Sequence, residues 1–247
     1  MPSKTGSWSL FFRILGMAFL LATVFTLWPR PGQNFGGWNP SLALLLTPVA
    51  SPQGETTRIR IGIVSGHMGN DSGAVCYDGN GNVTLTEAEV NQRIASLVQK
   101  KLQERGLEVD LLQEFDTRLN GYRAVALVSI HNDSCEYINE QATGFKVAAT
   151  SNGYDPNRAA RLAACLQDRY QRVTGLPFHP NTITRDMREY HAFSEIDPGT
   201  VAAIIETGFL YLDRDYLLNH TGQVAEGIVE GVLCFVYNEN IETTPVP

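Results

Sequence analysis

The sequence predicts an α/β fold, a mostly parallel twisted sheet with helices on both faces. Five apolar runs typical of strands alternate with three amphipathic patterns typical of helices. Two of the runs, 124–130 and 201–206, are almost continuously apolar, as expected for strands buried on both faces of a parallel sheet. In such sheets functional groups collect at the carboxyl ends of the strands.

The expected elements follow one another along residues 58–237. Strands are expected at 58–65, 107–112, 124–130, 144–150 and 201–206, and helices at about 87–105, 156–174 and 213–237. Gly106 suits the left-handed position after the first helix, and Pro156 suits the first turn of the second.

Residues 1–30 form a separate unit. No charge occurs from Ile14 to Trp28, and Trp8 and Trp28 bracket the apolar run as interfacial aromatics do. If Arg13 snorkels, about 20 residues are available, which is enough to cross a bilayer. We expect an uncleaved transmembrane signal-anchor, with a cleaved signal peptide as the alternative. Either one exports the remainder, which is therefore expected to be extracytoplasmic, tethered to the membrane or secreted.

The rest of the chain divides into three parts. Proline and glycine punctuate residues 31–57, which predicts a flexible linker. A catalytic domain is expected over 58–238 and a disordered tail over 239–247. The net charge of −7, with no basic run, argues against a nucleic-acid partner.

Three candidate functional residues lie at strand ends. His67 follows the first strand, His131 follows the third, and Glu206 ends the last. A histidine at a strand end is more often a hydrogen-bonded loop residue than a ligand. A carboxylate there costs several kcal/mol to bury unless a cation or donor meets it. Three such residues at one sheet edge therefore indicate a site.

Helical phase supplies a fourth candidate. The apolar face of the first helix consists of Val90, Ile94, Leu97, Val98 and Leu102. At about 100° per residue, Glu87 lies about 20° from Ile94 and faces the sheet, whereas Glu89 lies on the opposite side. The alternative is that Glu87 only complements the helix dipole or takes part in a cap at Thr86.

His67, Glu87 and His131 together form a three-ligand set for a catalytic zinc, with a fourth position open for water. Zinc lowers the pKa of bound water toward 7 and polarises a carbonyl. Glu206 would act as the base that transfers the water's proton to a leaving amine. The set predicts amide hydrolysis.

An even number of cysteines permits disulfides outside the cytoplasm. Cys76 and Cys135 each lie a few residues past a histidine of the predicted site, so convergence of the histidines would bring this pair together. Cys165 and Cys234 lie in apolar helical patterns, where buried thiols are expected and a second bridge is the alternative.

The sequence resembles the zinc-dependent N-acetylmuramoyl-L-alanine amidases of the amidase_3 type over about residues 59–237. The matching pieces are "SGHMGNDSGA" (65–74), "TEAEVNQRIA" (86–95), "LVSIHND" (127–133), "GFKV" (144–147) and "AAIIETGFLYLDRD" (202–215). The resemblance implies a sheet of about six strands, zinc ligands at His67, Glu87 and His131, and a catalytic glutamate at Glu206. It also implies peptidoglycan as substrate, cut between N-acetylmuramic acid and L-alanine.

Several expectations remain open. After "VDLL" the family usually shows an Arg, which this chain lacks, so the substrate groove is expected to differ. His191 and Asn132 are candidate substrate contacts, and Asp71 is a candidate support for the first ligand. A regulatory protein partner is plausible for a cell-wall hydrolase. The rival functions are a zinc peptidase or carboxypeptidase on another peptide, and a non-hydrolytic wall-binding or regulatory module.

Overall fold

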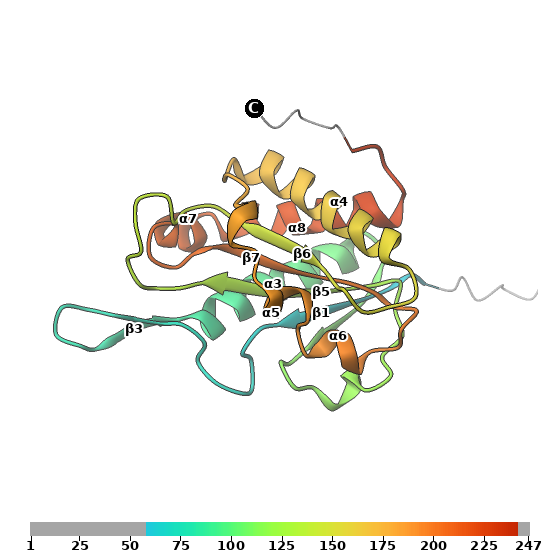
Figure 1. The fold of residues 1–247 in the computed structure, drawn as a ribbon, viewed down its shortest axis with the longest axis horizontal. Helices are drawn as coiled ribbons and strands as arrows, with labels where there is room; N and C mark the ends of the chain where they lie inside the picture. The colour runs from blue at the N-terminus through green and yellow to red at the C-terminus, as the bar shows by residue number, and fades with distance from the viewer. Residues whose placement is uncertain (1–57, 242–247) are drawn as a thin grey trace, which may run out of the picture. The chain divides into compact units, whose positions relative to one another are not determined.

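A five-stranded mixed sheet organises the described part of the chain (Figure 1). The computed structural model describes residues 58–241. In spatial order the strands are β4 (Glu108–Leu112), β1 (Arg60–Ser65), β5 (Ala126–Asp133), β7 (Val201–Phe209) and β6 (Lys146–Ala149). The first four are parallel and β6 runs antiparallel to β7. The mostly parallel α/β sheet is as predicted, with five strands rather than about six.

Alternation along the strands builds two cores, one on each face of the sheet. On β5 and β7, Ile130 and Ile205 belong to the larger core, while Leu127 and Ile204 belong to the smaller one. Both strands are buried along almost their whole length, which explains their nearly continuous apolar sequences.

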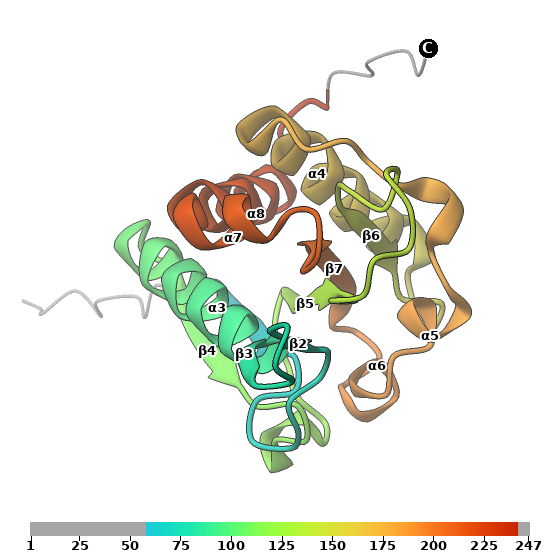
Figure 2. The same cartoon turned by 90° about the vertical axis from the view of Figure 1, so that its left-hand side faces the viewer.

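The helices are distributed unequally between the two faces (Figure 2). The three long helices cover the larger core, and they are α3 (Glu87–Glu104), α4 (Pro156–Thr174) and α8 (Thr221–Val236). The smaller core is covered by short segments, which include η1 (Thr117–Leu119), α5 (Arg185–Arg188) and α6 (Ala192–Glu195). The expectation of helices on both faces is therefore met on the second face only by short helices.

Local rules explain where the long helices begin and end. Thr86 caps α3, accepting from Glu89 N, and Asp155 caps α4, accepting from Arg158 N. Gly106 adopts a left-handed φ of 86° directly after Arg105, the C-cap residue of α3. The single helix expected over 213–237 is divided at His220 into α7 (Arg214–Asn219) and α8.

Two features at the carboxyl edge of the sheet differ from the expectation. Residues 75–86, for which no strand was expected, form a hairpin of β2 (Val75–Tyr77) and β3 (Val83–Thr86). A short 3₁₀ helix, η2 (Pro180–Thr182), precedes α5. Disulfides join Cys76 to Cys135 and Cys165 to Cys234, so the second pair is bridged rather than a pair of buried thiols.

The expected anchor over 1–30, the linker over 31–57 and most of the tail lie outside the described residues. Within 58–241, no helix combines the length and apolar character that crossing a bilayer requires.

Candidate metal centre and active site

The carboxyl edge of the sheet brings the three predicted metal ligands together. His67 follows β1, Glu87 is the first residue of α3, and His131 lies near the end of β5. One ligand atom from each lies within 4.8 Å of the others. The Glu87 carboxylate stands between the imidazoles, with Oε2 3.3 Å from His67 Nε2 and Oε1 3.2 Å from His131 Nδ1.

His67 is held in an unusual backbone conformation. Its φ of 64° lies in the left-handed region, which L residues with side chains seldom adopt. Its backbone N–H donates to Glu114 Oε2 at 2.7 Å, and its carbonyl accepts from Asn70 N and Asp71 N. Its ring Nδ1 lies 2.6 Å from Asp71 Oδ1. These bonds stabilise a turn that leads the chain out of β1 and fixes the imidazole.

Two glycines leave room for the ligands. An added Cβ at Gly66 would overlap the ring of His131. A Cβ at Gly73, where φ is 60°, would lie 2.6 Å from Glu87 Oε2 and 2.7 Å from His67 Cδ2. Packing around the ligands therefore requires glycine at both positions.

Glu87 is oriented by donors from three different segments. Ala74 N donates to Oε2 at 3.0 Å, Asn132 N donates to Oε1 at 3.1 Å, and Asn91 Nδ2 donates to Oε1 at 3.2 Å. The side chain is buried, on the helix face that the apolar periodicity predicted. Glu89, by contrast, is exposed and completes the capping box with Thr86.

Glu206 stands next to His131. The two are paired in register on β7 and β5, so their side chains leave the same face of the sheet. Glu206 Oε2 is buried and has no hydrogen-bond partner within 58–241. Burial raises the pKa of Glu206 to about 7, although the charge of His131 opposes the rise. Such a carboxylate can accept and release a proton near neutral pH.

The electrostatics of the cluster favour positive charge between its carboxylates. The hydrogen bond to Glu87 is the largest influence on the pKa of His67, which is raised to about 9. Burial opposes charge on His131, but its bond to Glu87 and the charge of Glu206 raise its pKa. Burial also opposes charge on Glu87, yet both imidazoles hold the pKa of Glu87 well below its usual range. A bound cation would satisfy the same carboxylates.

The residues fit zinc by the nature of their donors. Two imidazole nitrogens and one carboxylate match the three-ligand sets of catalytic zinc sites. His131 Nε2 is buried without a hydrogen bond, with Glu114 Oε2 at 3.7 Å, so this nitrogen can still donate its lone pair to a metal. His67 has Asp71 as the carboxylate partner of its other nitrogen, an arrangement that commonly orients metal-binding histidines.

Glu114 is a site residue that the sequence reasoning missed. It is buried, accepts from His67 N, and lies 3.7 Å from His131 Nε2 and 3.0 Å from His191 Nε2. The bond to His191 helps to lower its pKa to about 2, against the effect of burial. It follows β4 by two residues, so the strand-end argument that selected His67 applies to it as well.

The remaining predicted residues have different surroundings. Asn132 is buried, and its side-chain amide donates to Asn91 Oδ1 and accepts from Thr207 Oγ1. A contact of Asn132 with substrate stays a prediction. Asp71 contacts His67 as expected. His191 is partly exposed, bonds Glu114 and Glu195, and stacks on Phe115 at 4.2 Å between ring centroids. Its contact with substrate stays a prediction.

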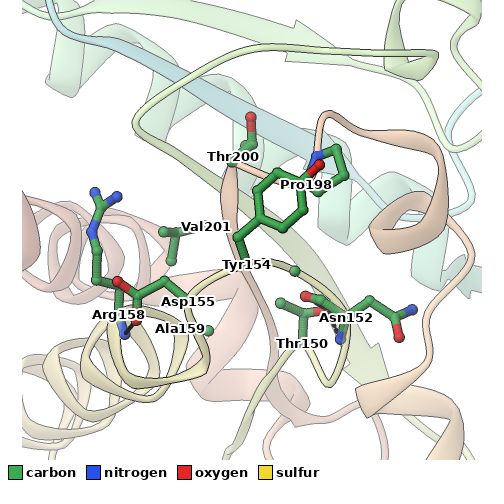
Figure 3. A pocket seen from close by; sticks show the side chains of 11 residues that line it. Thr150, Asn152, Tyr154, Asp155, Arg158, Ala159, Pro198, Thr200 and Val201 are labelled. Carbon is green, nitrogen blue, oxygen red and sulfur yellow. Dashed lines mark hydrogen bonds between the residues drawn. The ribbon is translucent and has the colours of Figure 1, made fainter.

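A shallow pocket lies away from this cluster (Figure 3). Its walls come from the residues that follow β6, the start of α4 and the residues that precede β7. The close-up shows Tyr154, Asp155 and Arg158 around it together with Pro198 and Thr200. Because β7 begins here and Glu206 lies toward its other end, the pocket and the candidate site occupy opposite edges of the sheet.

Comparison with known proteins agrees with the geometry. A search of curated protein sequences found no match. Three solved structures illustrate the similarity in fold. An N-acetylmuramoyl-L-alanine amidase from Clostridium difficile 630 is 23% identical with a TM-score of 0.56, and 74% of this chain and 99% of that chain are covered. The N-acetylmuramoyl-L-alanine amidase AmiC2 of Nostoc punctiforme is 21% identical with a TM-score of 0.53, and 72% of this chain and 97% of that chain are covered. The CwlD amidase from Clostridioides difficile, solved in complex with the GerS lipoprotein, is 18% identical with a TM-score of 0.55. The match covers 73% of this chain and 100% of that chain.

The family assignment comes from the sequence profile rather than from these distant structures. The Amidase_3 family model, described as N-acetylmuramoyl-L-alanine amidase, matches residues 61–234. That range covers most of the chain and contains all four predicted site residues. The chain belongs to the N-acetylmuramoyl-L-alanine amidase family, Amidase_3.

Proposed function

We propose that the protein is a zinc-dependent hydrolase that cuts the amide bond between N-acetylmuramic acid and L-alanine in peptidoglycan. His67, Glu87 and His131 would hold the metal, and Glu206 would act as the general base. The observation that carries the proposal is the convergence of these three ligands beside a buried carboxylate with an unbonded oxygen.

The side chains have separate tasks in this proposal. When bound, zinc supplies Lewis acidity, which polarises the scissile carbonyl and makes water more acidic. Glu206 takes the proton of the attacking water on its unbonded Oε2 and delivers it to the leaving amine. In the metal-free protein, burial raises the pKa of Glu206 to about 7, which suits a carboxylate that must accept and then release a proton near neutral pH.

The hydrogen bonds around the ligands keep them in place during turnover. Ala74 N and Asn132 N fix the two oxygens of Glu87, and Asp71 fixes the ring of His67. Glu114 ties the turn at His67 to His191. Removing such supporting groups typically weakens metal binding by about 10- to 100-fold.

The setting of the protein is part of the proposal. Two disulfides within 58–241 support an oxidising, extracytoplasmic compartment. A signal-anchor over 1–30 would tether the domain there. The complex of CwlD with the GerS lipoprotein supports a regulatory protein partner for this chain as well.

The test is digestion of intact peptidoglycan by the full chain, with and without a chelator, followed by mass analysis of the products. Release of stem peptides with a free L-alanine amine, lost with chelator and restored by zinc, is expected. Cleavage only within the peptide would instead support a zinc peptidase, and zinc binding without cleavage would support a wall-binding module.

A further inference from the structure

The carboxylate of Glu87 is clamped between two backbone amides from distant parts of the chain. Ala74 N donates to Oε2 at 3.0 Å and Asn132 N donates to Oε1 at 3.1 Å. Each oxygen therefore has its own backbone donor. The distance between the two amides sets the orientation of the Glu87 carboxylate, because each N–H is fixed to the backbone of its own segment.

Both donor segments carry a cysteine of the same disulfide. Cys76 lies two residues after Ala74, and Cys135 lies three residues after Asn132. The bridge joins them with 5.3 Å between their Cα atoms. A single disulfide therefore links the two chain segments whose backbone amides hold the Glu87 carboxylate.

The bridge is also connected to the start of the helix that carries Glu87. In the β2–β3 hairpin, Cys76 pairs with Leu85 and Val75 pairs with Thr86, the residue before Glu87. The hairpin and the disulfide therefore close a loop from the first residue of α3 to the end of β5. Figure 2 shows the hairpin and the end of β5 at the same edge of the sheet.

The other end of the bridge is fixed to β7. Cys135 Sγ lies 3.6 Å from the carbonyl oxygen of Leu210, and Leu210 N donates to the carbonyl of Asp133 at 3.2 Å. The Cys135 segment consequently has a defined position relative to the strand that carries Glu206. The cross-link therefore joins segments that adjoin α3, β5 and β7, each of which contributes a site residue.

We propose that the Cys76–Cys135 disulfide is a positioning cross-link for the metal site, which sets the separation of the two amides that orient Glu87. This inference rests on the proposed function, because it takes Glu87 as a metal ligand. Within 58–241, the hydrogen bonds of the His67, Glu87 and His131 side chains involve neither cysteine. The cysteines act through Ala74 and Asn132.

The second disulfide provides a matched control within the same chain. Cys165 and Cys234 join α4 to α8, and both are fully buried in the larger core. The two bridges close loops of similar length, with sequence separations of 59 and 69 residues. Loss of either should reduce stability to a similar degree. Neither Cys165 nor Cys234 lies on a segment that supplies a hydrogen bond to Glu87 within 58–241.

The experiment measures the zinc dissociation constant of the full chain by competition with a chromophoric chelator. Cys76→Ala with Cys135→Ala should raise this constant about tenfold or more, the range found when groups that orient ligands are removed. Cys165→Ala with Cys234→Ala should leave it within about twofold, although its thermal unfolding midpoint falls. An unchanged constant in the first variant, or an equal rise in both, overturns the proposal.

A second measurement covers the case in which the first variant does not fold. Unsubstituted protein is titrated with a small dithiol, which becomes a cyclic disulfide as each protein bridge gains two electrons and two protons. Cys135 is partly exposed, whereas both cysteines of the other bridge are buried, so the 76–135 bridge should open first. Alkylation and mass analysis identify the reduced pair.

The same chelator competition is then applied to the protein with only the 76–135 bridge reduced. A dissociation constant about tenfold higher supports the proposal, and an unchanged one overturns it. His131→Ala separates this result from the proposed function. If unsubstituted protein and His131→Ala bind zinc equally, the proposed metal site fails and this inference fails with it.

Discussion

His131 and Glu206 are paired in register on neighbouring strands, so a predicted metal ligand and the predicted base leave the same face of the sheet side by side. The pairing explains how two residues separated by 75 positions share one site. It also explains their mutual influence, since His131 opposes the rise in the pKa of Glu206 and Glu206 helps to raise that of His131.

Gly66→Ala should weaken zinc binding by about tenfold or more, because the new Cβ would overlap the His131 ring and displace it. Zinc competition against a chelator measures the effect. Gly79→Ala is the control, since a Cβ there meets no described atom within 4 Å. Equal zinc affinity in the two variants would show that the His131 ring moves without affecting the metal.

Asp71→Asn should lower zinc affinity by about tenfold, because the charge beside His67 Nδ1 is lost while the amide can still accept from Gly73 N. Asp215→Asn, which changes an exposed carboxylate, should leave the affinity unchanged. Isothermal titration of both variants tests this. A similar loss in the control would indicate a general effect of net charge.

Zinc affinity should rise with pH between 6 and 9. In the metal-free protein the pKa of His67 is about 9 and that of His131 is also raised, so protons compete with the metal below those values. Each protonated histidine should contribute about a tenfold change in the dissociation constant per pH unit. The check is chelator competition at several pH values, and a flat profile would exclude displacement of these protons.

Metal-free Glu206→Gln should be more stable than the unsubstituted protein at pH 8. The pKa of Glu206 is raised from 4.5 to about 7 on folding, so the folded state binds the proton more tightly and loses stability as pH rises from 4.5 through 7. Glutamine does not titrate, and the gain should be on the order of 3 kcal/mol. Urea unfolding measures it, and it should disappear near pH 4.5.

Glu104→Gln, at an exposed position, is the control for that experiment. Its stability should follow that of the unsubstituted protein at both pH values to within about 0.5 kcal/mol. If Glu206→Gln is no more stable than the unsubstituted protein at pH 8, burial does not destabilise the ionised form of Glu206 in the folded protein.

Much of the fold could be predicted from the sequence because its strands are apolar runs and because α3 and α4 begin at clear side-chain caps. The helical phase placed Glu87 on the buried face, and α3 and α4 begin and end within one residue of the expected positions. The direction of β6 could not be predicted, since an antiparallel edge strand has no local signature. The division at His220 falls in the polar, glycine-containing stretch 219–223, which the expectation of one continuous helix did not take into account.

The site was predicted less completely than the fold. Residues at ends of strongly apolar strands were found, but Glu114 follows β4, whose sequence mixes charged with apolar residues, and its role depends on contacts with three distant residues. The β2–β3 hairpin was missed because its strands are only 3 and 4 residues long, too short for a periodic pattern to show.

The most direct test of the separate roles of the three metal ligands and of Glu206 uses Glu206→Ala. Its zinc content and its turnover are measured on one preparation of the full chain. The variant should bind zinc in the same ratio as the unsubstituted protein and lose peptidoglycan cleavage by about 100-fold or more. Loss of zinc together with activity would make Glu206 a ligand, and full turnover would exclude it as the base.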